Sequence, residues 1–75
     1  MDHIERRAKA ARRLKSDSAF QEFIEDVRNA QLESFAASAA SEIEAREEAH
    51  AILRALNQIE MSLDAAIAAE RLAQS

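Results

Sequence analysis

Neither glycine nor proline occurs anywhere in the 75 residues of the chain. Glycine supplies the positive φ angles of tight β-hairpin turns, and proline marks the sharp corners of loops. The chain is instead rich in Ala, Glu, Arg and Leu, which are strong helix formers. We therefore predict an all-α protein, in which a short basic N-terminal helix precedes an antiparallel helical hairpin with coiled-coil-type packing.

Few large apolar side chains are available to build a core. The hydrophobic fraction is 48%, but half of those residues are alanines. Cysteine is absent, so neither a disulfide nor a thiolate metal site supports so small a scaffold. We expect a single domain that gains stability by forming a homo-oligomer.

Charge divides the chain into two parts, a basic helical arm at residues 1–15 and an acidic remainder at residues 16–75. The arm holds six basic and two acidic side chains, whereas the remainder holds four basic and twelve acidic ones. Such an arm is expected to bind the phosphates of duplex DNA or the acidic surface of a protein. The candidate nucleic-acid-binding residues are Arg6, Arg7, Lys9, Arg12, Arg13 and Lys15.

Two interpretations of the arm remain open. Helical spacing places Arg6, Lys9 and Arg13 on one flank, opposite Ala8 and Ala11, so that they can meet phosphates together. Alternatively, the basic side chains are solvated or pair with carboxylates of the same chain. The candidate carboxylates are Glu22, Glu25 and Asp26. So short a helix is marginal alone, and ordering of the arm only on binding is one expectation.

The hairpin is expected to contain helices at about 18–37 and 42–72, joined by a turn in the uncharged stretch 35–41. Ser18 with Gln21, and Ser41 with Glu44, have the spacing of capping boxes. The apolar stripe predicted for the first of these helices consists of Phe20, Phe23, Ile24, Val27 and Phe35. The alternative is one unbroken helix from residue 18 to residue 72, because the stretch contains no helix breaker.

A heptad pattern follows in the longer helix. Its spacing of four and three residues predicts an apolar seam that packs against the aromatic stripe or against another copy, and that ends in solvent at Glu70. The seam residues are Ala45, Ala49, Ile52, Leu56, Ile59, Leu63 and Ala66. Leu53, Met61 and Leu72 lie off this seam.

No pattern in the sequence indicates catalysis, a cofactor or a metal. Glu47 and His50 have the spacing of a carboxylate-bridged metal site, but they lie away from the seam and have no second copy. A glycine-rich phosphate loop is impossible without glycine, and no Ser stands in a recognisable nucleophile motif. No apolar run approaches the roughly 20 residues that span a bilayer. We expect a non-enzymatic protein, with no membrane contact.

Several short motifs carry a resemblance to a known group of proteins. They are Leu14-x-x-Asp17-x-x-Phe20-x-Glu22, Val27-Arg28, Glu44-Ala45-Arg46 and Leu53-Arg54-Ala55-Leu56. Over approximately residues 14–72 the chain resembles short helical-hairpin proteins of tailed bacteriophages and gene transfer agents, and is similar to small-terminase-like DNA-packaging subunits. The resemblance implies a ring-forming protein that passes viral DNA to a separate motor ATPase. The chain has no room for a full N-terminal helix-turn-helix domain, so DNA contact falls to the basic arm.

The leading hypothesis is therefore an oligomerising helical protein of phage type that acts in viral DNA packaging or virion assembly. Its expected partners are duplex DNA and a motor ATPase, portal or capsid protein, in the host cell cytoplasm or in the virion. A second hypothesis is a structural virion component or adaptor that binds another protein through the apolar seam. A third is a small helical regulator of a host protein.

Overall fold

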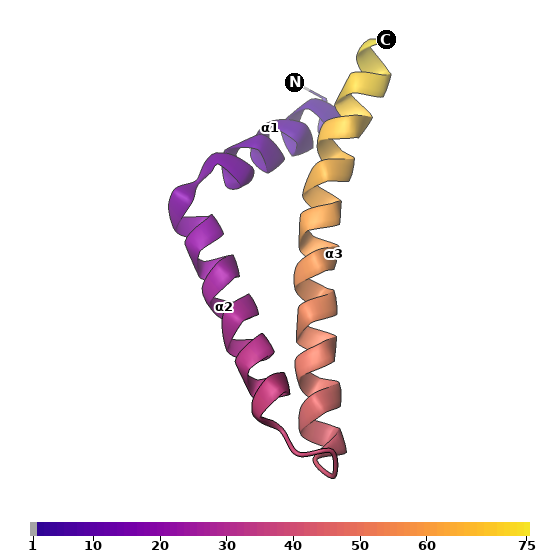
Figure 1. The fold of residues 1–75 in the computed structure, drawn as a ribbon. Helices are drawn as coiled ribbons and strands as arrows, with labels where there is room; N and C mark the ends of the chain where they lie inside the picture. The colour runs from indigo at the N-terminus through magenta and orange to yellow at the C-terminus, as the bar shows by residue number, and fades with distance from the viewer. Residues whose placement is uncertain (1) are drawn as a thin grey trace.

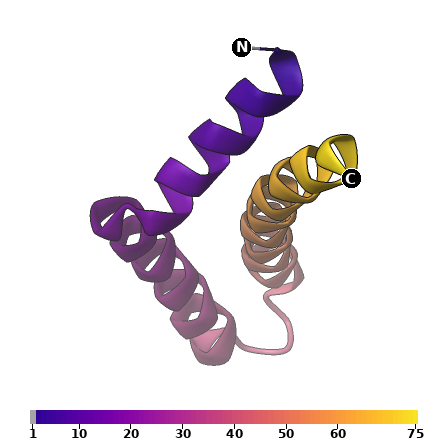
Figure 2. The same ribbon diagram turned by 90° about the horizontal axis from the view of Figure 1, so that it is seen from above.

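The computed structural model describes residues 2–75 and contains three helices, α1 (His3–Ser16), α2 (Ser18–Ala37) and α3 (Ile43–Gln74). No strand occurs within residues 2–75, so the prediction of an all-α protein is confirmed. The long helix α3 runs the length of the molecule, and α2 returns antiparallel to it (Figure 1). Helix α1 crosses from the start of α2 to the C-terminal part of α3 (Figures 1 and 2).

Asp17 separates α1 from α2 without a glycine. Its backbone is extended, with φ −80° and ψ 112°, and its N–H donates to the carbonyl oxygen of Leu14 at 3.2 Å. The Asp17 Oδ1 accepts from the N–H of Phe20 at 3.0 Å, so one residue ends α1 and begins α2. The predicted cap at Ser18 with Gln21 is therefore wrong, because Ser18 is already the first helical residue.

A short turn at residues 38–42 joins α2 to α3, and the structure is a hairpin rather than one unbroken helix. Ser38 leaves the helix in an extended conformation, and its hydroxyl donates to the carbonyl oxygen of Phe35 at 2.7 Å. Glu42 Oε1 accepts from the N–H of Ala39 at 3.0 Å. The capping box predicted at Ser41 and Glu44 is wrong, because Glu42 precedes α3 and makes no side-chain cap bond to it.

The buried core is as thin as the composition indicates. It draws on all three helices and consists of Ala8, Ala11, Ile24, Ala49 and Leu56. Two of these alanines are in α1, where Ala8 is 0% and Ala11 is 2% exposed. Small side chains let helix backbones approach closely, so α1 is seated directly on the hairpin and not held away from it.

The side of α3 that faces α2 matches the predicted seam at some positions and is shifted by one residue at others. We define the contact line by Ile24, Arg28 and Gln31 of α2, and by Ala49, Leu53, Leu56, Glu60, Leu63 and Ile67 of α3. The heptad prediction holds at Ala49 and Leu56, which are buried, and at Ile52, Leu63 and Ala66, which are half-buried. At Ala45 and Ile59 it is wrong, because both are exposed.

The predicted aromatic core is only partly formed. Ile24 is buried and Phe20 is half-buried, and the guanidinium of Arg46 lies 4.6 Å from the centre of the Phe35 ring. Phe23, by contrast, is 70% exposed and Val27 is 41% exposed. These two residues do not join the core, because α2 turns its Ile24 and Arg28 positions towards α3 instead.

Candidate nucleic-acid interface

Helix α1 is held on α3 by apolar and ionic contacts together. Ala8 and Ala11 are buried, and within residues 2–75 the basic side chains of Arg12 and Lys15 form ion pairs with Glu70 and Asp64 of α3. The arm is therefore a packed helix within the chain itself. The N-terminus of α1 is capped by Asp2, whose Oδ1 accepts from the N–H of Glu5 at 2.8 Å.

These ion pairs decide between the two interpretations for part of the arm. Arg12 and Lys15 bind carboxylates of the same chain, although the partners are on α3 and not at Glu22, Glu25 or Asp26. Glu70 is correspondingly half-buried, so the expectation that the seam ends in solvent there is wrong. The sequence offered one signal for Glu70, its position at the end of the heptad spacing.

The remaining basic residues of α1 form two groups. Arg6, Lys9 and Arg13 lie around a shallow exposed depression with Ala10, on the flank opposite Ala8 and Ala11. Across residues 2–75 the structure records no ion pair for these three side chains. We call Arg6, Lys9 and Arg13 the basic row; it extends about 10 Å along the helix, at a rise of about 1.5 Å per residue.

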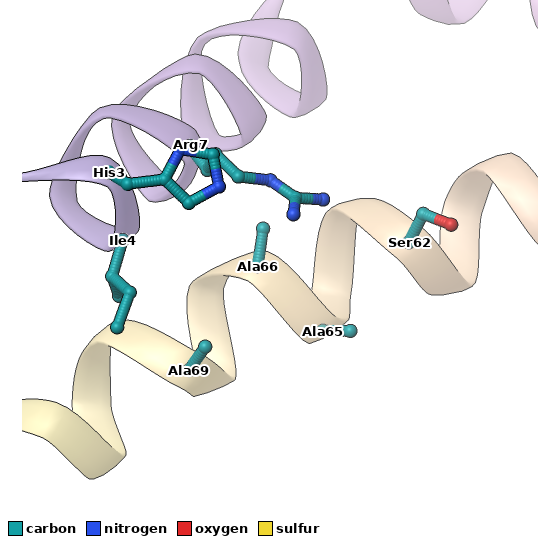
Figure 3. Close-up of a pocket in the computed structure, with 7 residues that line it drawn as sticks. All are labelled: His3, Ile4, Arg7, Ser62, Ala65, Ala66 and Ala69. Carbon is teal, nitrogen blue, oxygen red and sulfur yellow. The ribbon is translucent and has the colours of Figure 1, made fainter.

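Arg7 belongs to a different surface, a groove of about 230 Å³ between the start of α1 and the C-terminal half of α3. Ile4 and Arg7 extend from α1 over a floor of Ala66 and Ala69, and Ser62 lies at one end (Figure 3). The structure therefore separates the six predicted nucleic-acid-binding residues into three outward ones, one in this groove and two that are ion-paired.

Polar contacts close one side of the α2–α3 hairpin. Arg28 Nη1 donates to Asn57 Oδ1 at 3.0 Å, and the same guanidinium forms an ion pair with Glu60. Sequence reasoning missed these partners, because Arg28 lies 29 and 32 residues away from them in the chain. No pattern in the sequence singles these partners out, because polar and charged side chains occur throughout the segment that forms α3.

Glu47 and His50, which have the sequence spacing of a metal site, lie on the surface. His50 and Glu47 line a shallow depression with Phe35, Ala40, Ile43 and Arg46. Among residues 2–75 no three His, Cys, Asp or Glu side chains lie close enough together to hold a metal ion. Nor is any of the helices in this part of the chain both long enough and apolar enough to cross a membrane.

A comparison of the chain with models of protein families, with curated proteins and with solved structures finds no match.

Proposed function

We propose that the chain is a non-enzymatic, oligomerising helical protein that binds the backbone of duplex DNA through α1, in viral DNA packaging or virion assembly. The observation that carries this proposal is the basic row. Arg6, Lys9 and Arg13 are exposed side by side and make no ion pair within residues 2–75, on a helix that is already fixed by Arg12 and Lys15.

The chemistry of the row fits phosphates better than bases. Guanidinium and ammonium groups along one helix face can contact successive phosphates, and each contact releases bound counterions from the DNA. No Phe, Tyr or Trp lies in α1 for a base to stack on. A single copy contributes few contacts, so an oligomer that presents several rows is needed for useful affinity.

The resemblance to small-terminase-like subunits supplies the process in which such a protein acts. In that role it binds DNA and a motor ATPase, portal or capsid protein, and it carries out no catalysis itself. The host cell cytoplasm or the virion is the corresponding location.

Salt-dependent DNA binding tests the proposal. Fluorescence anisotropy with a labelled duplex should show binding at low salt that weakens as salt increases. The double variant Arg6→Ala/Arg13→Ala should flatten the slope of log K against log salt by about 1.8 per copy, at about 0.9 per lost phosphate contact. The matched control is Arg54→Ala/Arg71→Ala, which removes the same charge from exposed positions on α3. Equal effects of the two variants, or no binding at low salt, would overturn the proposal.

A second candidate function is a structural virion component or adaptor that binds another protein. The exposure of Phe23 and Val27 favours it, because apolar side chains that a fold leaves uncovered often mark protein interfaces. In that case the basic row pairs with an acidic protein surface. Binding to a portal or capsid protein that is lost with Phe23→Glu and weakened by Arg6→Ala/Arg13→Ala, by a chain that does not bind duplex DNA, would support this candidate.

A further inference from the structure

The two sides of the hairpin differ in chemistry. Phe23, Val27 and Ala30 of α2 each precede a contact-line residue by one position. On α3 the same is true of Ile52, Ala55 and Ile59. In an antiparallel pair of right-handed helices, residues rotated in the same sense from the contact line lie on the same side of the pair. These residues therefore share one face, which we call the open face.

Between Ile52 and Ile59 the open face carries no charge, in a chain of which 32% of the residues are charged; Glu48, which precedes Ala49 of the contact line, lies nearer the turn. Arg28 forms a hydrogen bond with Asn57, which follows Leu56 of the contact line and so lies in the opposite sense of rotation, and an ion pair with Glu60 on the contact line. One side of the hairpin is thus closed by polar contacts. The other side exposes 70% of Phe23 and 43% of Ile59 to solvent.

Helix α1 lies on the same side as the open face. At the start of α1, Ile4 and Arg7 line a groove with Ser62 and Ala66, which precede Leu63 and Ile67 of the contact line by one residue; at the end of α1, Lys15 pairs with Asp64, on the other side of Leu63. Helix α1 thus covers this side over the C-terminal half of α3 and leaves the part beside Phe23 and Ile59 uncovered. The open face therefore continues the surface on which the chain already buries Ala8 and Ala11 of α1.

The total surface area indicates how much remains to be covered. A folded monomer of 8.3 kDa is expected to expose about 4,600 Å². This chain exposes 5724 Å², about 1,100 Å² more than that expectation. A protein interface of standard size buries about 800 Å² on each partner. The excess, summed over the whole surface, is comparable in size with one dimer interface per chain.

We infer that the open face binds the open face of a second copy in a two-fold symmetric dimer. A two-fold contact places the same patch against itself, and a patch without charge does so without repulsion even though each copy has a net charge of −4. Phe23 and Ile59 are the central anchors. The basic row lies on α1, outside the open face, so the dimer deepens the proposed function, on which it rests, by naming the partner and the face that the oligomer uses.

Sedimentation velocity without DNA, over a wide range of concentration, tests the inference. The wild-type chain should sediment as a dimer of twice 8.3 kDa and dissociate on dilution. Phe23→Glu and Ile59→Glu should each weaken dimerisation by about thirtyfold or more, as expected for interface anchors. The matched controls are Leu32→Glu on α2 and Met61→Glu on α3, which change large apolar residues that are 50% and 63% exposed away from the open face.

A cysteine reporter gives an independent measurement, because the natural chain has no cysteine. Ala30→Cys, on the open face, should form an interchain disulfide under mild oxidation, whereas Ala36→Cys, exposed elsewhere on α2, should not. This result holds even if a glutamate variant fails to fold. A monomer at every concentration, or equal effects of the open-face and control variants, would overturn the inference.

The outcomes for the dimer and for the proposed function are distinguishable. Arg6→Ala/Arg13→Ala should dimerise as the wild type does, because the basic row is outside the open face. Loss of DNA binding with an intact, Phe23-dependent dimer overturns the proposed function alone. DNA binding by a chain that stays monomeric overturns the dimer alone.

Discussion

Asp17 makes three hydrogen bonds at the junction of α1 and α2. It accepts from the N–H of Phe20, its own N–H donates to Leu14, and its carbonyl oxygen accepts from the N–H of Gln21 at 3.0 Å. The sequence pattern Ser16-Asp17-Ser18 predicted a helix start here but left three residues able to cap it. Which of the three residues caps α2 depends on the direction of the backbone at the end of α1, and no local sequence pattern specifies that direction.

Asp17→Ala should lower the free energy of unfolding by about 1 kcal/mol, because the N–H of Phe20 loses its acceptor. For a chain of this size the midpoint of thermal unfolding should fall by about 4–8 °C per kcal/mol, measured by circular dichroism. Asp17→Asn keeps an acceptor and should stay close to the wild type. Ser18→Ala should have little effect, and a loss as large as that of Asp17→Ala would place the cap at Ser18 instead.

The sequence predicted that the helices exist, but it did not predict which side of α3 faces α2. Ala49, Leu56 and Leu63 belong both to the predicted seam and to the observed contact line. The patterns diverge between these residues: Ile52 and Leu53 are both half-buried, and Glu60 pairs with Arg28 of α2, whereas Ile59 is exposed. Apolar residues occupy both 52 and 53, so periodicity alone cannot choose. The contacts of Arg28 in α2 with Asn57 and Glu60 in α3 fix which side of α3 faces α2.

The candidate site was predictable to a similar degree. The spacing of Arg6, Lys9 and Arg13 placed them correctly on one exposed flank, because the period of a helix is fixed. The roles of Arg12 and Lys15 were not readable, since their partners Glu70 and Asp64 lie 58 and 49 residues further along the chain. Such pairings depend on where α1 crosses α3.

The close seating of α1 can be tested by enlarging a buried alanine. Ala8 is fully buried, so Ala8→Leu should force α1 away from α3 and cost about 1–3 kcal/mol. Hydrogen exchange should then increase across His3–Ser16 in particular. Ala10→Leu is the matched control, because Ala10 is exposed on the same helix. If both variants exchange alike, α1 does not rest on α3 through Ala8.

The whole molecule is long and thin for its mass. Its radius of gyration is 16.2 Å and its extents are 51 × 22 × 15 Å. A compact chain of 75 residues has a radius of gyration of about 11 Å. Three helices in a slender triangle bury few large side chains, so the stability of a single copy rests on residues such as Leu56. The remaining exposed apolar surface stabilises the fold only when another molecule covers it.

Two nearby apolar residues of α3 should therefore respond differently to protein concentration. Leu56 is 7% exposed, and Leu56→Ala should cost about 2–5 kcal/mol at any concentration. That cost is a large part of the about 4–11 kcal/mol expected for a chain of this length. Ile59→Ala should cost little in dilute solution, where Ile59 is solvent-exposed in the monomer, and more in concentrated solution, where the dimer covers it. Thermal unfolding midpoints measured across a range of concentration separate the two cases. An Ile59→Ala deficit that is independent of concentration would mean that Ile59 stabilises the single chain and not the contact between copies.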